Sequence, residues 1–216
     1  GKRMPTRVGY SAPVSELVKK AHQNKQITKA QANAFMRHKK TSFIVLGQLI
    51  TSKTRLRLLI KFFISQANRG YLNGLANEMG ESTNAIRKEL NHLQNAGYLD
   101  KVRVNNKVEY KANTKHPLFE VLRKVVLKHL GLEDVVETVL KRMGNVEQII
   151  LVGDYAKGND SGLIEVFLIG QGLNMEYIAQ LEDKIEDLIG RKVSFYLASK
   201  FLADRENIIL FNSKDK

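Results

Sequence analysis

The stretch ESTNAIRKELNHLQNAGYLDKVRVNNKVEYKA, residues 81–112, changes its hydrophobic period near the middle. In the first half, apolar residues recur at the spacing of a helix: Ile86, Leu90 and Leu93. Ser82 is placed to cap this helix and Gly97 to end it. In the second half, valines alternate with charged residues, which is the period of a strand. The stretch therefore predicts a helix followed by a β-hairpin.

The expected hairpin has the three-residue loop Asn105-Asn106-Lys107, because asparagine tolerates the left-handed conformation that such a loop needs. With this loop Val104 faces Val108, and Val102 faces Tyr110. The hairpin is then predicted to have one apolar face and an exposed basic tip.

Two further helices are expected upstream. Ser52 is a good N-cap for a helix whose apolar residues recur at helical spacing: Leu56, Leu59, Ile60 and Phe63. A second helix fits residues 72–79, with Gly80 as its stop. Three helices, a short turn between the second and third, and a hairpin predict a winged helix-turn-helix domain over residues 47–115. The alternative is a small helical bundle with an incidental hairpin.

The charge of the chain is unevenly distributed. Its formal net charge is +13. Residues 1–46 carry ten Lys and Arg against one acid, residues 47–130 fifteen against six, and residues 131–216 ten against fifteen. A basic front and an acidic back suggest that only the front meets a polyanion; the alternative is a merely solvated basic surface.

Two absences limit the class of protein. The sequence has no cysteine, which excludes disulfides and zinc–thiolate sites and fits a cytoplasmic protein. No apolar run approaches the roughly 18 residues that a membrane span needs.

The predicted helix-turn-helix indicates which residues would meet double-stranded DNA. Its second helix lies in the major groove, with outward residues of the N-terminal half at the base edges. These candidates are Ser82, Thr83, Asn84, Arg87, Lys88 and Asn91. The hairpin supplies cations for phosphates, which add affinity but no base reading: Lys101, Arg103, Lys107 and Lys111. The alternative for any one of these residues is an ordinary solvated side chain, but the group as a whole is much harder to explain in that way.

The segments on either side of this domain are less distinctive. Residues 1–46 form a basic N-terminal extension, either a mobile arm or a pair of helices starting near Pro13 and Thr28. Residues 116–144 are expected to form a helical linker of two helices, 118–130 and 133–143. Their apolar side chains need a partner in the winged helix, in the back domain or in a second copy of the chain. Because winged-helix regulators commonly bind as two-fold dimers, we expect a homodimer with its contact at 118–143.

Residues 145–216 predict a small α/β domain. Strands are expected at 147–152, 163–169, 193–198 and 207–211, with a helix at 174–189. The stretch GDYAKGNDSGLIEVFLIG, residues 153–170, follows the first strand and includes the second. A nucleotidyltransferase site requires a Gly-Ser turn and an Asp-x-Asp pair on a strand, so that both carboxylates point the same way and share metal ions.

The stretches ITSKTRLRLLIKFF (50–63) and ANTKHPLF (112–119), together with 81–99 and 153–170, resemble bacterial transcriptional regulators that fuse a winged helix to a nucleotidyltransferase domain of the DNA polymerase beta superfamily. The resemblance implies an α+β chain, a winged helix-turn-helix domain followed by a small α/β nucleotidyltransferase-like domain. Gly153 matches the family glycine, and Asp154 replaces the phosphate-holding serine. The usual basic-glycine pair is matched by Lys157 and Gly158. At the two aspartate positions this chain has Leu163 and Glu165.

These replacements predict that the domain is not an enzyme and uses no metal or cofactor. Leucine cannot bind a metal, and Asp154 places negative charge where a triphosphate would lie. The domain would then serve oligomerisation or ligand sensing. Gly153, Lys157 and Gly158 either hold a small anionic effector or only make a tight turn. Two alternatives stay open: an active enzyme with a metal site rearranged around Asp154, Asp160 and Glu165, and a winged helix that binds protein rather than DNA.

Overall fold

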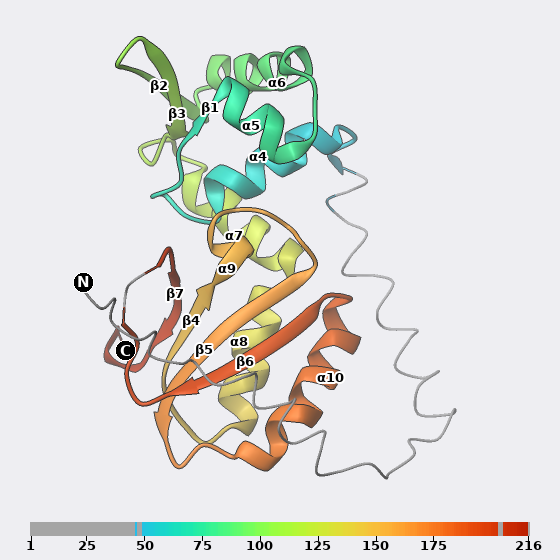
Figure 1. Cartoon of the computed structure of the whole chain (residues 1–216), viewed down its shortest axis with the longest axis vertical. Helices are drawn as coiled ribbons and strands as arrows, with labels where there is room; N and C mark the ends of the chain where they lie inside the picture. Colours follow the sequence, from blue (N-terminus) through green and yellow to red (C-terminus); the bar gives the residue numbers. More distant parts are fainter. Residues whose placement is uncertain (1–45, 47–48, 203–204, 216) are drawn as a thin grey trace, which may run out of the picture.

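The computed structural model describes residues 46, 49–202 and 205–215. The predicted N-terminal extension therefore lies outside the described residues except at its last position. We call residues 49–115 the front module and residues 145–215 the back module. Figure 1 shows the two modules one above the other; of the two connecting helices, Phe119–Leu130 lies at their junction and Leu132–Arg142 lies behind the back sheet. The chain is a mixed α+β protein.

The front module consists of three helices and a three-stranded antiparallel sheet. The helices are α4 (Lys53–Phe63), α5 (Leu72–Met79) and α6 (Thr83–Asn95). The strands are β1 (Gly70–Tyr71), β2 (Leu99–Val104) and β3 (Lys107–Ala112), in the order β1-β3-β2. Strand β1 has only two residues, and the sequence pattern did not predict it because so short a strand has no period of its own.

Local signals begin and end these helices as predicted. The Ser52 hydroxyl accepts a hydrogen bond from the backbone N–H of Arg55, and the Ser82 hydroxyl accepts one from Ala85, at 3.1 and 3.2 Å. Helix α5 ends at Gly80, whose φ of 63° is left-handed and favours glycine. The three predicted helices are confirmed.

The predicted register of the hairpin is wrong by one residue. The loop has two residues, Asn105 and Asn106, both with positive φ (46° and 64°), and Val104 pairs with Lys107. Such a two-residue turn matches the right-handed twist of the strands, so its geometry sets the register. Val102 and Val108 stay 44% and 40% exposed, so neither face of the hairpin is a buried apolar face that would reward pairing the valines.

The connecting helices α7 (Phe119–Leu130) and α8 (Leu132–Arg142) pack within the chain rather than spanning a gap. Helix α7 lies on α4, where the rings of Phe63 and Phe119 have centroids 5.6 Å apart. Helix α8 packs on α10 (Ile178–Ile189) and on the back sheet. Most apolar side chains proposed for a dimer contact are therefore buried or half-buried inside one chain, and Leu118 and Val121 are the exposed ones, at 44% and 54%.

The back module is a four-stranded mixed sheet with helices on one face. The strands are β4 (Asn145–Val152), β5 (Leu163–Gln171), β6 (Lys192–Ala198) and β7 (Ile208–Asn212), in the order β6-β5-β4-β7. Strands β5 and β6 are parallel, whereas β4 pairs antiparallel with β5 and β7. Helix α10 follows the 3-10 turn η1 (Met175–Tyr177), and with α8 it covers one face of the sheet (Figure 1). The strands and the helix predicted here are confirmed, and the predicted loop contains a short helix, α9 (Gly153–Ala156).

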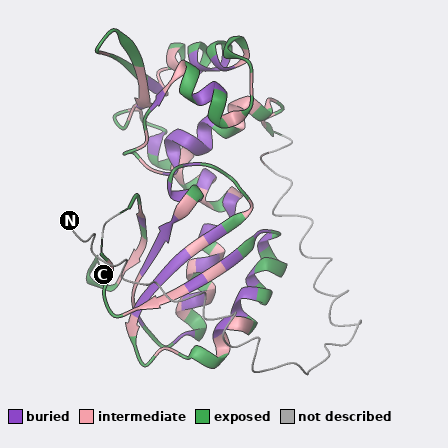
Figure 2. Ribbon diagram, in the orientation of Figure 1, coloured by how far each residue is buried: buried purple, intermediate pink, exposed green. Residues whose placement is uncertain are grey.

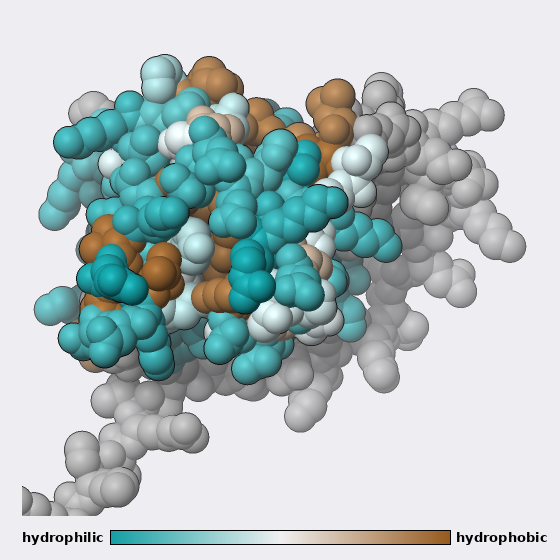
Figure 3. Space-filling model, turned by 90° about the horizontal axis from the view of Figure 1, so that it is seen from above, coloured by the Kyte–Doolittle hydropathy of each residue, from teal (hydrophilic) through white to brown (hydrophobic). Residues whose placement is uncertain are grey.

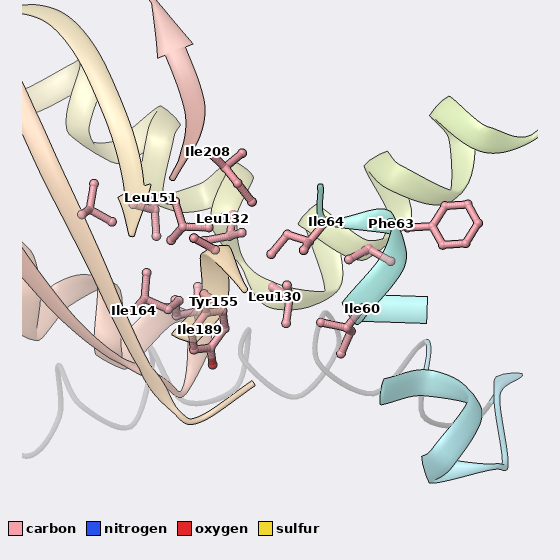
Figure 4. Packing of buried hydrophobic residues seen from close by; sticks show 14 of the residues in the cluster. Ile60, Phe63, Ile64, Leu130, Leu132, Leu151, Tyr155, Ile164, Ile189 and Ile208 are labelled. Carbon is pink, nitrogen blue, oxygen red and sulfur yellow. The ribbon is translucent and has the colours of Figure 1, made fainter. Parts of the chain in front are cut away.

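One hydrophobic core runs through both modules. Figure 2 shows buried residues continuing from the front helices through α7 into the back sheet. In Figure 4, Ile64 and Leu130 lie between Phe63 of the front module and Leu132 and Tyr155 toward the back. A smaller cluster lies on the other face of the sheet, where Phe167 stacks on Tyr196 at 5.2 Å. The shared core holds the two modules in one arrangement.

Candidate nucleic-acid interface

Helix α6 presents its candidate DNA-binding residues outward. Three apolar residues on its inner face are fully or almost fully buried: Ile86, Leu90 and Leu93. The six candidate residues are all exposed: Ser82 and Thr83 at the start of the helix, and Asn84, Arg87, Lys88 and Asn91 on its outer face. The helical period of 3.6 residues separates the four outer-face residues from the three buried ones, so the helix is anchored by one face and leaves the other open to a partner.

Two side chains on the outer face of α6 are hydrogen-bonded to each other, and the hydroxyl at the start of the helix is bonded to the backbone. Arg87 donates from Nη1 to Oδ1 of Asn84 at 3.2 Å, which places a guanidinium and an amide side by side. Both groups can make bidentate contacts to bases. The Ser82 hydroxyl oxygen already accepts the N-cap hydrogen bond from the backbone N–H of Ala85.

The hairpin adds cations at the same end of the molecule. Lys101, Arg103 and Lys107 are exposed, and Lys111 is half-buried. Figure 1 shows α6 and the β2–β3 hairpin together at the top, away from the back sheet. Figure 3 looks down on this end and shows a largely hydrophilic surface with scattered hydrophobic residues. This end has the polarity of a surface that meets a polar, charged partner.

Four of the five acids in the front module have a cationic partner. On the sheet, the Tyr71 hydroxyl donates to Glu109 at 2.7 Å, and Arg69 lies 3.8 Å from the same carboxylate. Glu78, Glu81 and Glu89 each pair with a cation of α4. Sequence reasoning missed these pairs, because their members lie 17 to 40 residues apart and no local pattern joins them.

Glu89 is the most buried of these acids, at 7% exposure. Burial opposes its ionisation, but hydrogen bonds from Arg55 and Ser52 outweigh that effect and hold the pKa of the Glu89 carboxyl below its usual range. The group is therefore an anion tied to α4.

In the back module, Glu165 lies against Gly153. A Cβ added at Gly153 would come within 2.1 Å of a carboxylate oxygen of Glu165. The Tyr196 hydroxyl donates to the other oxygen at 3.3 Å, and burial together with Glu165 raises the pKa of Tyr196. Leu163, at the first position of the family's aspartate pair, is 40% exposed.

Asp160 belongs to a separate cluster. Arg191, 6% exposed, donates from Nε and Nη2 to its two oxygens at 3.0 and 2.7 Å. The buried Tyr155 also donates to Asp160, and burial followed by this bond raises the pKa of Tyr155. Partial burial opposes ionisation of Asp160, but bonds from Arg191 and Tyr155 prevail and lower its pKa.

Two of the three acids of the rearranged metal site suggested above are thus engaged elsewhere. Asp160 is held by Arg191, and Glu165 by Tyr196. Within the described part of the chain, no group of three His, Cys, Asp or Glu gathers as metal ligands.

The remaining residues of the suggested pocket differ in their exposure to solvent. Asp154 and Lys157 are exposed on α9 and at its end. Gly158 is buried and packs against the backbone of Lys61, so that an added Cβ would lie 2.6 Å from the Cα of Lys61. The structure brings Gly153 and Glu165 together and uses Gly158 at the junction with the front module.

The chain matches no known family model and no curated protein. Solved structures similar to part of it include the AntR antimony-specific transcriptional repressor, at 21% identity and a TM-score of 0.33, over 55% of this chain and 93% of that chain. Another is the transcriptional regulator BldR from Sulfolobus solfataricus, at 18% identity and a TM-score of 0.30, over 61% of this chain and 96% of that chain. At these scores neither similarity carries an argument about function. None of the described helices is long and apolar enough to cross a bilayer.

Proposed function

We propose that the chain is a DNA-binding transcriptional regulator whose front module is a winged helix-turn-helix. The observation that supports this most is the outer face of α6, where four exposed polar or basic residues lie opposite three buried apolar ones, with Ser82 and Thr83 exposed at the start of the helix. Such a helix fits the major groove of double-stranded DNA.

Within this proposal the two elements have different tasks. Arg87 and Asn91 read base edges from α6, since arginine pairs well with guanine and asparagine with adenine. Lys101, Arg103 and Lys107 of the hairpin bind phosphates, because flexible cations on an exposed turn give affinity without sequence reading.

We further propose that the back module is a catalytically inactive nucleotidyltransferase-like domain for oligomerisation or ligand sensing, with boundaries at 47–115, 116–144 and 145–216. Leu163 supports inactivity because it offers no oxygen to a metal ion. A homodimer contact in this region would use two exposed side chains, Leu118 just before α7 and Val121 on it. A small anionic effector near Gly153 and Lys157 would have to displace the Glu165 carboxylate that lies there.

The test of DNA binding separates base reading from phosphate binding. A bound duplex is first selected from random DNA, and its affinity is measured by fluorescence anisotropy at several KCl concentrations. Replacing Arg87 and Asn91 with Ala is expected to remove the preference for the selected duplex over random DNA. Replacing Lys101 and Lys107 with Ala is expected to weaken both duplexes alike and to reduce the salt slope by about 0.9 for each phosphate that the protein no longer neutralises.

The matched control replaces Lys184 and Lys192 with Ala, two exposed lysines of the back module. It changes the net charge by the same amount as the hairpin variant. Equal binding of the wild type and the Arg87/Asn91 variant to the selected duplex would contradict the proposed interface, and so would equal losses of affinity in the hairpin variant and the control.

A further inference from the structure

Three cations of helix α4 pair with acids of the helix-turn-helix: Arg55, Arg57 and Lys61, which we call the α4 cation set. Arg55 Nε lies 2.7 Å from Oε2 of Glu89 in α6. Lys61 Nζ lies 2.8 Å from Oε1 of Glu78 in α5. From the sequence alone these cations are equally suited to contact DNA phosphates.

The middle cation reaches the turn between α5 and α6. Arg57 Nη1 donates to the carbonyl oxygen of Met79 at 2.9 Å and lies 3.5 Å from Glu81. Residues 72–95 contain three acids, Glu78, Glu81 and Glu89, and each of them is paired with α4. The pairing therefore covers the first helix, the turn and the second helix in chain order.

The pair with α6 is the most buried and the most elaborate. The side chain of Glu89 is 9% exposed, that of Arg55 34%. The Ser52 hydroxyl donates to Oε1 of Glu89 at 2.8 Å while accepting the N-cap bond of α4. Both oxygens of Glu89 are thus held by the first turn of α4, which restricts rotation of α6 about its own axis as well as its distance from α4.

The anchored carboxylate of Glu89 also determines where the outward face of α6 points. Residues 87 and 91 lie two positions before and after Glu89, so they point away from α4 when Glu89 points toward it. Any rotation of α6 that carried Arg87 off a base edge would also break the contacts of Glu89.

The three acids of the helix-turn-helix are paired with cations of α4, so their carboxylates do not compete with DNA for the cations of α6.

We propose that Glu89, held by Ser52 and Arg55, is a positioning residue that fixes the rotation of α6 for base reading, and that the α4 cation set binds the protein's own acids rather than DNA. The inference rests on the proposed function, because it concerns how α6 reads bases.

A double-mutant cycle tests it on the full chain. The variants are Arg55→Ala, Glu89→Gln and the double variant, each measured on the selected duplex and on random DNA across KCl concentrations. Glu89→Gln keeps the shape of the side chain and loses its charge. The control cycle uses Lys141→Ala and Glu137→Gln, an exposed ion pair of α8.

Each single variant is expected to lower affinity for the selected duplex by about tenfold, because a charged hydrogen bond that orients α6 is removed. Binding to random DNA and the salt slope stay unchanged, and the double variant loses less than the product of the single losses. If Arg55→Ala weakens both duplexes and flattens the salt slope, Arg55 is a phosphate contact and the proposal is overturned. Multiplicative losses in the cycle overturn it as well.

Hydrogen exchange of the free protein provides a readout that does not depend on DNA. Glu89→Gln is expected to speed amide exchange in α6 while leaving α10 unchanged. Unchanged exchange in α6 overturns the proposal even if the wild type binds no DNA. Conversely, a wild type that prefers no duplex contradicts the proposed function while faster α6 exchange still supports the role of Glu89.

Discussion

Replacing Gly158 with Ala is expected to loosen the contact between the two modules. Gly158 has a φ of 81° and packs against the end of α4. A Cβ added there would lie 2.6 Å from the Cα of Lys61, 2.8 Å from its carbonyl oxygen and 3.1 Å from Nδ2 of Asn68. The first two neighbours are backbone atoms, so no side-chain rotation can make room.

The expected loss of stability has two parts. A left-handed φ costs a residue with a Cβ about 1 to 2 kcal/mol. Forcing a methyl group into a packed contact costs about 1 to 3 kcal/mol more. The free energy of unfolding of Gly158→Ala should therefore fall by about 2 to 5 kcal/mol.

Gly162 provides a matched control in the same loop. Its φ is 89°, but an added Cβ would have no neighbour within 4 Å. Gly162→Ala should therefore lose only the backbone part, about 1 to 2 kcal/mol. Urea unfolding of both variants, followed by circular dichroism, measures the difference directly. Equal losses in the two variants would refute the packing argument and leave Gly158 free for the suggested anion pocket.

Three further predictions concern acid stability, the hairpin turn and catalysis. The lowered pKa values of Glu89 and Asp160 contribute stability that is fully present above their unfolded pKa of about 4 and is lost as pH falls through the folded values. Asp160→Asn should therefore flatten the fall of unfolding free energy in acid, and an unchanged pH profile would contradict this. Asn106→Gly should preserve the hairpin register, whereas Asn106→Val should lower the free energy of unfolding by about 1 to 2 kcal/mol. Urea unfolding measures the stability, and cross-strand nuclear Overhauser contacts report the register. Equal stability of both variants would count against the turn. The wild type should release no pyrophosphate when it is incubated with magnesium or manganese and labelled nucleoside triphosphates. Leu163→Asp combined with Asp154→Ser and Glu165→Asp should raise magnesium-dependent nucleotide binding. Turnover that Glu165→Ala abolishes would show an active site.

The helices could be predicted from the sequence because their signals are local. Ser52 and Ser82 cap their own helices, and Gly80 ends α5 by its own backbone conformation. Hydrophobic spacing then identifies the buried face of each helix without reference to its partner. The exposure of Arg87 and Asn91 follows from the same spacing.

The hairpin shows where local patterns conflict. Alternating valines favoured one register, and two consecutive asparagines allowed another. The second prevailed because both faces of the hairpin are partly open to water, so pairing Val102 with Tyr110 would have buried little apolar surface. The turn geometry then decided the register.

Local sequence was sufficient to specify the helices, the longer strands of both modules and the outward face of α6, because capping, turn formation and hydrophobic period act within a few residues. The roles of Glu89 and Gly158, in contrast, follow only from the tertiary structure. Glu89 meets Arg55 across 34 residues, and Gly158 meets Lys61 across the junction of the modules. Such contacts depend on how whole elements pack, and the shape of the shared core sets that packing rather than the residues next to Glu89 or Gly158 in the chain.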